Sequence, residues 1–215
     1  MRHVKKYSSF YIPYLLFVVV VTIVILINDK ADLHLWLTSF YTPIGDIFFR
    51  YYTEVGGNIP FVIIGMLMFY RYRIALFLLI TQLVSGLVVH ILKRLWDEPR
   101  PLSYFSEKFP TIELHAIVGV PMHTHNSFPS GHTTSAFALF LSISYFSKKP
   151  PIHFLCFLLA VLVGFSRVYL SQHFILDLLV GSIIGVSVSI CCNLYLDRFQ
   201  MKWADGSLRD VFSRK

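Results

Sequence analysis

Residues that could carry out chemistry lie near the ends of the apolar segments of this chain. His173 and Asp177 are four residues apart, a spacing that places two side chains on one face of a helix. A carboxylate bonded to one ring nitrogen fixes the imidazole tautomer and leaves the other nitrogen free to act as a nucleophile or base. The pair is therefore a candidate for covalent catalysis. A plain hydrogen bond between packed helices would use the same two residues.

The residues around this pair are of types that bind an anion. Lys93, Arg100 and Arg167 offer charge-assisted donors, which favour a phosphate. Residues 129–132 read PSGH and open another apolar segment. Proline suits a first helical turn, glycine lets a ligand approach the backbone, and a helix start binds anions. PSGH alone could be a simple turn, but beside three cations it predicts a phosphate cradle that includes Ser130 and Gly131.

His132 is the second imidazole of this group. A phosphate dianion beside it would raise its pKa and keep it protonated as a general acid. One histidine could then attack phosphorus while the other protonates the leaving alkoxide. Phosphoryl transfer needs little beyond such positioning and charge neutralisation.

Three further histidines have weaker claims to a function. His123 and His125 could form half of a metal site, but no cysteine or suitably spaced carboxylate joins them, so we expect solvated loop histidines and no metal. His90 lies one turn before Lys93 and either lines the site or makes a bond between packed helices. The cysteines Cys156, Cys191 and Cys192 all lie in apolar runs and are expected to be packing residues rather than disulfides.

Composition favours a membrane protein. Hydrophobic residues make up 55% of the 215 residues and charged residues 14%, which is low for a soluble domain. The net charge of +7 suits an anionic surface or substrate. No basic stripe lies on a soluble face, so nucleic acid is not an expected partner.

Apolar runs predict an all-α protein with six transmembrane helices in one domain, residues 1–215. The core covers about 10–197 and a basic tail about 198–215.

A basic stretch precedes the first run, but Asn28-Asp29-Lys30 follow it in place of a small-residue cleavage site, which predicts a retained anchor. Residues 31–52 are rich in aromatic side chains and predict an interfacial helix. Residues 98–128 form the longest polar connection. The predicted spans are Phe10–Asn28, Gly57–Tyr70, Ile74–Leu92, Pro129–Phe146, Ile152–Phe165 and His173–Leu196.

Six spans bring the polar residues to one membrane face. The end of the third span, the start of the fourth, the end of the fifth and the start of the sixth all lie on the same side. Most of the 19 Lys and Arg residues fall on the opposite side, which predicts cytoplasmic termini and a site on the outer face. Charged groups at membrane depth are costly and usually mark function.

Three motifs together resemble a known family. Residues 93–101 read KRLWDEPRP and match K-x6-R-P, residues 129–132 read PSGH, and residues 166–177 read SRVYLSQHFILD and match S-R-x5-H-x3-D. This combination resembles the type 2 phosphatidic acid phosphatases, membrane relatives of the vanadium haloperoxidases. The resemblance implies a metal-independent phosphohistidine on His173, oriented by Asp177, with His132 as the acid. It also implies that Lys93, Arg100, Ser130, Gly131 and Arg167 hold the phosphate.

The predicted activity is hydrolysis of a lipid phosphate, a monoester or a diphosphate, by an integral membrane enzyme without cofactors. The candidates are phosphatidic acid, phosphatidylglycerol phosphate, undecaprenyl diphosphate and lipid A. The compact chain resembles bacterial members, which predicts the cytoplasmic membrane with the site on its periplasmic face. The alternatives are a lipid phosphotransferase with the same intermediate, a transporter whose charges line a pathway, and a haloperoxidase, which six apolar spans argue against.

Overall fold

The computed structural model describes residues 5–196 and 206–209, and within these ranges the chain forms helices and no strand. Most of the predicted basic tail, residues 198–215, lies outside the described residues. The elements are α2 (Ser8–Ile27), α3 (Lys30–Thr38), α4 (Pro43–Tyr52), the 3-10 helix η1 (Thr53–Val55), α5 (Ile59–Met68), α6 (Tyr72–Leu95), α7 (Pro101–Lys108), α8 (Gly131–Tyr145), α9 (Pro150–Tyr169) and α10 (Ile175–Leu196).

Four helices among the described residues are long and apolar enough to cross a membrane: α2, α6, α9 and α10. They correspond to the first, third, fifth and sixth predicted spans, so an all-α membrane protein is confirmed. The second and fourth predicted spans appear as the shorter helices α5, with 10 residues, and α8, with 15. A full crossing takes about 20 residues, so six crossings stay a prediction.

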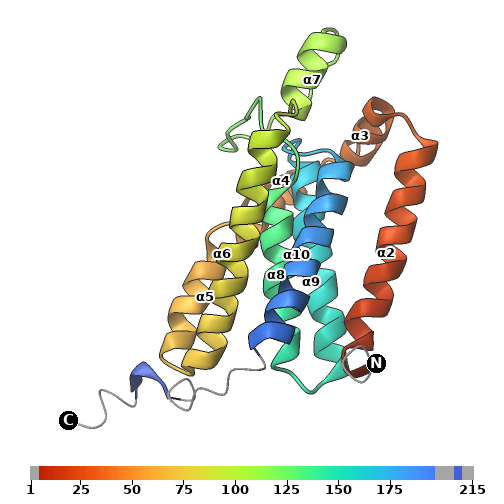
Figure 1. The fold of residues 1–215 in the computed structure, drawn as a ribbon. Coiled ribbons are helices and arrows are strands. Elements are labelled where there is room, and N and C mark those ends of the chain that lie inside the picture. The colour runs from red at the N-terminus through yellow and green to blue at the C-terminus, as the bar shows by residue number, and fades with distance from the viewer. Residues whose placement is uncertain (1–4, 197–205, 210–215) are drawn as a thin grey trace.

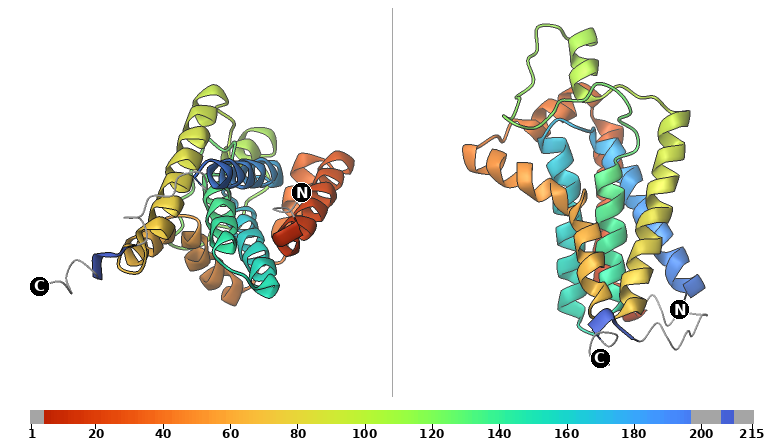
Figure 2. Two further views of the ribbon diagram at one scale, coloured as in Figure 1. Left: turned by 60° about the horizontal axis from the view of Figure 1, so that its bottom comes forward. Right: turned by 90° about the vertical axis from the view of Figure 1, so that its left-hand side faces the viewer.

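Helix α8 runs through the middle of the bundle, with α6, α9 and α10 packed around it (Figures 1 and 2). Buried residues occur on every side of it, including Ala136, Phe137 and Leu139. Helix α10 approaches closely because it carries glycines at the contact. A Cβ atom on Gly185 would come within 2.4 Å of the Thr134 carbonyl oxygen. Small residues at such contacts let membrane helices pack backbone against backbone.

Helix α2 lies at the edge of the bundle (Figure 1), and its exposed side chains are apolar. Its inner side packs aromatic rings, with Phe10 against Phe157 and Tyr14 against Phe137. Its outer side exposes Leu16 and Ile23, among others. A helix that is apolar all round and half exposed suits contact with lipid.

The segment predicted as one interfacial helix forms two, α3 and α4, with a break after Thr38. Thr42 ends the break as the N-cap of α4, and Pro43 is the first helical residue, which is a strong helix start. Helix α4 points away from the bundle axis (Figure 2). Its N-terminus is bound to the end of α9, because Tyr169 Oη donates to Asp46 Oδ1 over 2.7 Å. The same carboxylate contacts the polar connection, where His115 Nε2 lies 2.9 Å from Asp46 Oδ2.

Three boundaries differ from the predictions in ways that affect the polar residues. Helix α6 continues to Leu95 and α9 to Tyr169, so Lys93 and Arg167 lie on helices rather than after them. Helix α10 starts at Ile175, so His173 precedes the helix. The polar connection contains α7, a short helix that packs Phe105 in a small apolar cluster with Ala31 and Phe174.

Candidate active site

His173 and Asp177 form a buried pair at the start of α10. That end of the bundle is opposite the start of α2 (Figure 1). His173 lies in the turn before α10, and Asp177 lies in the first turn of that helix. His173 Nδ1 is 3.3 Å from Asp177 Oδ2, and the same oxygen accepts the Phe174 N–H over 3.0 Å. The carboxylate thus holds both the ring and the backbone beside it. Burial lowers the pKa of His173, which favours the neutral ring, and Asp177 opposes this effect.

The PSGH segment begins α8 and is bound to the same pair. Ser130 is the N-cap, and its Oγ accepts hydrogen bonds from the Thr133 N–H and from Thr133 Oγ1. The Ser130 N–H donates to the Asp177 carbonyl over 3.1 Å. A side chain on Gly131 would meet only Val89, at 3.7 Å. The protein alone therefore does not require glycine here, which leaves room for a ligand at the start of α8.

The three predicted cations surround this region. Arg167 is buried, and its Nη1 donates to Thr53 Oγ1 over 2.8 Å, while its Nε is buried with no partner among the described residues. Arg100 donates from Nε to the His125 carbonyl and from Nη1 to Gln172 Oε1. Lys93 Nζ donates to the Asn126 carbonyl. Together with His173, all three cations lie within electrostatic range of His132.

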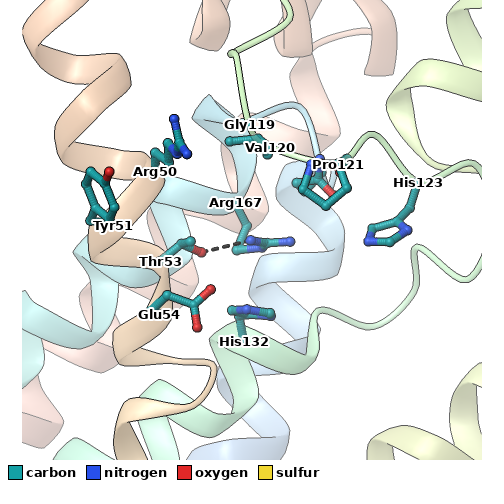
Figure 3. A pocket seen from close by; sticks show the side chains of 11 residues that line it. Arg50, Tyr51, Thr53, Glu54, Gly119, Val120, Pro121, His123, His132 and Arg167 are labelled. Atoms are coloured by element: carbon teal, nitrogen blue, oxygen red, sulfur yellow. Dashed lines mark hydrogen bonds between the residues drawn. The ribbon is translucent and has the colours of Figure 1, made fainter.

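A cavity of about 370 Å³ opens beside His132 and Arg167, a volume within the usual range for small-molecule sites. Figure 3 shows the Arg167 guanidinium projecting into it near the His132 ring, with the Glu54 carboxylate facing both. The cavity is lined by Arg50, Tyr51, Thr53, Glu54, Gly119, Val120, Pro121, His123, His132, Arg167 and Gln172. The positive charges of Arg50 and Arg167 on its wall make it suited to an anion.

The other histidines fall into separate places. His123 lies largely exposed on the cavity wall, where partial desolvation and three nearby cations, led by Arg100, lower its pKa. His125 is exposed, with Nδ1 3.7 Å from Asp97 Oδ2. His90 is exposed on α6 and does not line the cavity. In the part of the chain that the structure describes, no group of three or more His, Cys, Asp or Glu residues is arranged to hold a metal ion.

Three polar residues at the site were missed by sequence reasoning. Thr53 and Glu54 lie in η1, at the end of the aromatic segment, where nothing in their spacing pointed to the motifs. Glu54 Oε2 and His132 Nε2 lie 2.8 Å and 3.1 Å from the position that a Cβ atom on Gly57 would take, so both face one small space. Ser127 donates from Oγ to Asp177 Oδ2. Its place two residues before PSGH was the one available signal.

Comparisons with known proteins identify relatives of this chain. A family model described as the PAP2 superfamily matches residues 74–201. Lipid phosphate phosphatase 2 of Arabidopsis thaliana is 28% identical over 218 residues, which cover 84% of this chain and 75% of the plant protein.

Two solved structures share the fold. LpxE of Aquifex aeolicus aligns with a TM-score of 0.67 at 28% identity, covering 77% of this chain and 95% of that protein. A transmembrane PAP2 type phosphatidylglycerolphosphate phosphatase from Bacillus subtilis aligns with a TM-score of 0.62 at 23% identity, covering 91% and 98%. The arrangement of helices described above is therefore that of known membrane proteins.

Proposed function

Because the chain belongs to the PAP2 superfamily, we propose that this membrane phosphatase hydrolyses a lipid phosphate, a monoester or a diphosphate, through a phosphohistidine on His173. One observation carries the proposal above the others. A buried imidazole is held through Nδ1 by a carboxylate, within electrostatic range of a second imidazole and of the two cations Arg167 and Arg100. That arrangement suits an oriented nucleophile facing an anionic group.

The first step is attack by His173 Nε2 on phosphorus. The Nδ1 proton stays on the ring, so the phosphorylated imidazole carries a positive charge that Asp177 balances. The bond between phosphorus and the leaving oxygen breaks, and His132 gives its proton to that oxygen. Water then attacks phosphorus with His132 as the base, the P–N bond breaks, and neutral His173 and inorganic phosphate are restored.

The cations neutralise the oxygens of the phosphoryl group. Arg167 lines the cavity, and its guanidinium can offer a forked pair of donors. Lys93 donates to the backbone carbonyl of Asn126 and Arg100 to that of His125, and each retains further N–H groups for a ligand. Such fixed charges are the main requirement of phosphoryl transfer.

The bundle also supports a lipid substrate. The site lies at one end of helices whose outer surfaces are apolar, so a phosphate can bind at the interface while its hydrocarbon chains stay in the bilayer. We propose six crossings, with α5 and α8 completing the four long helices, and with α3 and α4 at the interface. The described end of α10 and the start of α2 lie at the opposite end of the bundle from the site (Figure 1). This supports cytoplasmic termini and a site on the outer, periplasmic face of a bacterial membrane.

The test is phosphate release by the purified protein in detergent. The panel is phosphatidic acid, phosphatidylglycerol phosphate, undecaprenyl diphosphate and lipid A, each with wild type, His173→Ala and the matched control His90→Ala. We expect release by wild type and by the control, and loss of release with His173→Ala in a protein that keeps its melting temperature.

Two other outcomes would overturn the proposal. Phosphate transfer that requires an added lipid acceptor would identify a phosphotransferase with the same intermediate. Solute flux in vesicles that persists in His173→Ala, with no phosphate release from any substrate, would identify a transporter.

A further inference from the structure

The hydroxyl of Ser127 completes the set of donors around the catalytic carboxylate. Ser127 is buried, and its Oγ donates to Asp177 Oδ2 and lies 3.5 Å from His173 Nδ1. Asp177 Oδ2 therefore accepts hydrogen bonds from Ser127 Oγ and from the Phe174 N–H, and it lies next to Nδ1 of His173. A carboxylate that accepts two or three hydrogen bonds is held in one orientation and in its charged form.

The position of Ser127 is itself fixed by the first motif. Its N–H donates to the Glu98 carbonyl over 2.9 Å, and the preceding N–H, of Asn126, donates to Asp97 Oδ1 over 3.2 Å. The Arg100 N–H donates to the Thr124 carbonyl over 2.8 Å. Hydrogen bonds thus fix residues 124–127 to residues 97–100. Because Ser127 is held in this way, its hydrogen bond fixes the Asp177 carboxylate in turn.

The second motif meets the same residue from the other side, since the Ser130 N–H donates to the Asp177 carbonyl. Asp177 is consequently the point at which all three motifs join, and Ser127 is the side chain that connects the first motif to its carboxylate. A hydroxyl with a purely structural role could donate to any nearby carbonyl oxygen. The Ser127 hydroxyl instead donates to Asp177 Oδ2, the oxygen that faces His173.

From these contacts we infer that Ser127 is a positioning residue, which holds Asp177 so that His173 keeps its proton on Nδ1 and presents Nε2 to phosphorus. The inference rests on the proposed function for its consequence in catalysis, but the tautomer of His173 can be observed without any substrate. The positioning role of Ser127 and the proposed function can therefore be refuted independently of each other.

The substrate-free test is ¹⁵N NMR of the full chain in detergent with labelled histidine, with the His173 signals assigned by their loss in His173→Ala. Wild type is expected to show the Nδ1–H tautomer alone. Ser127→Ala is expected to show a mixture of tautomers, and Ser142→Ala to match wild type. Ser142 is a suitable control because it is buried and its Oγ lies 3.0 Å from Ser189 Oγ on α10, within a pair of hydroxyls. An unchanged tautomer in Ser127→Ala would overturn the inference.

The kinetic test is a double-mutant cycle with Asp177→Asn. Ser127→Ala should lower kcat about ten- to a hundredfold, the effect of losing a hydrogen bond to a charged group, with little change in KM. In the Asp177→Asn background the same change should cost much less, because the charged oxygen that Ser127 binds is gone. Equal losses in both backgrounds would show a role that does not pass through Asp177. If Ser127→Ala does not fold, Ser127→Cys keeps a weak donor and should give an intermediate kcat. No phosphate release by wild type would count against the proposed function, while the tautomer would still decide the role of Ser127.

Discussion

Arg167 Nη1 on α9 donates a hydrogen bond to Thr53 Oγ1, 114 residues earlier in the chain, over 2.8 Å. The bond is buried and sits on the wall of the cavity beside His132. Thr53 precedes residues 74–201, which match the family model. The N-terminal part of the chain therefore contributes directly to the placement of a cation that the family motif supplies.

Removing the Thr53 hydroxyl should weaken phosphate binding without unfolding the protein. In Thr53→Val the Arg167 guanidinium loses a fixed partner, and a hydrogen bond to a charged group contributes about 1.5–3 kcal/mol. We expect KM for the best lipid substrate to rise about tenfold or more. Thr81→Val is the control, because Thr81 is also buried but donates to the Phe77 carbonyl within its own helix and does not line the cavity. Equal effects of the two variants would contradict a specific role for Thr53.

Loss of the second imidazole should depend on the leaving group. His132→Ala should lower kcat roughly 10²–10⁴-fold on a lipid phosphate, the usual range for general acid–base catalysis. The loss should be much smaller on an aryl phosphate whose leaving oxygen needs no proton. The comparison of the two substrates is the measurement, and an equal loss on both would rule out His132 as the acid.

The sequence motifs indicated residues that lie close together in the structure, but not the contacts that hold them in place. The spacing of His173 and Asp177 indicated a hydrogen-bonded pair, and the structure has one, although His173 precedes α10 instead of lying on it. The pair survives this difference because Asp177 also binds the Phe174 N–H and so fixes the turn. The roles of these residues in catalysis stay proposals.

The contacts that support the motifs were not predictable in the same way. Ser127 and Thr53 contact residues that lie 50 and 114 positions away in the sequence, and no local periodicity indicates such contacts. Helix boundaries were misplaced where polar residues belong to apolar helices, as with Lys93 on α6 and Arg167 on α9. Hydropathy ends a span at a charge, whereas the backbone continues its hydrogen bonds through it.

Activity should survive chelation. The proposed neutralisation of the phosphate uses Lys93, Arg100 and Arg167, which are protein charges that EDTA does not remove. Phosphate release measured before and after EDTA dialysis should be the same within error. A loss of activity that an added divalent cation restores would show that a metal takes part.

Vanadate should inhibit by occupying the phosphate site, since its five-coordinate form resembles the transition state of phosphoryl transfer. Inhibition should be competitive with the lipid. Arg167→Lys should weaken it about tenfold or more, because lysine keeps the charge but loses the fork of donors that arginine directs at oxygens. Non-competitive inhibition, or full sensitivity in the variant, would place the anion elsewhere.

Acid should destabilise the protein in part through His34, which is buried on α3 with Nε2 3.3 Å from Ser171 Oγ. Burial lowers the pKa of His34 from 6.5 to about 4; Lys30 acts in the same direction and Asp177 against it. The folded state therefore binds the proton less readily than the unfolded chain does. Its stability is full above pH 6.5 and falls between pH 6.5 and 4, by up to about 3 kcal/mol from this group.

The variant His34→Gln removes this titration but keeps a polar side chain. Melting temperatures in detergent from pH 7 to pH 4 should fall less steeply for His34→Gln than for wild type, even if the variant starts lower at pH 7. His90→Gln, at an exposed histidine on α6, is the control for the change of histidine to glutamine as such. Parallel curves for wild type and His34→Gln would mean that His34 gains a proton as easily in the folded protein as in the unfolded chain. The ring would then have to meet an acceptor at its buried Nδ1, which has no partner among the described residues.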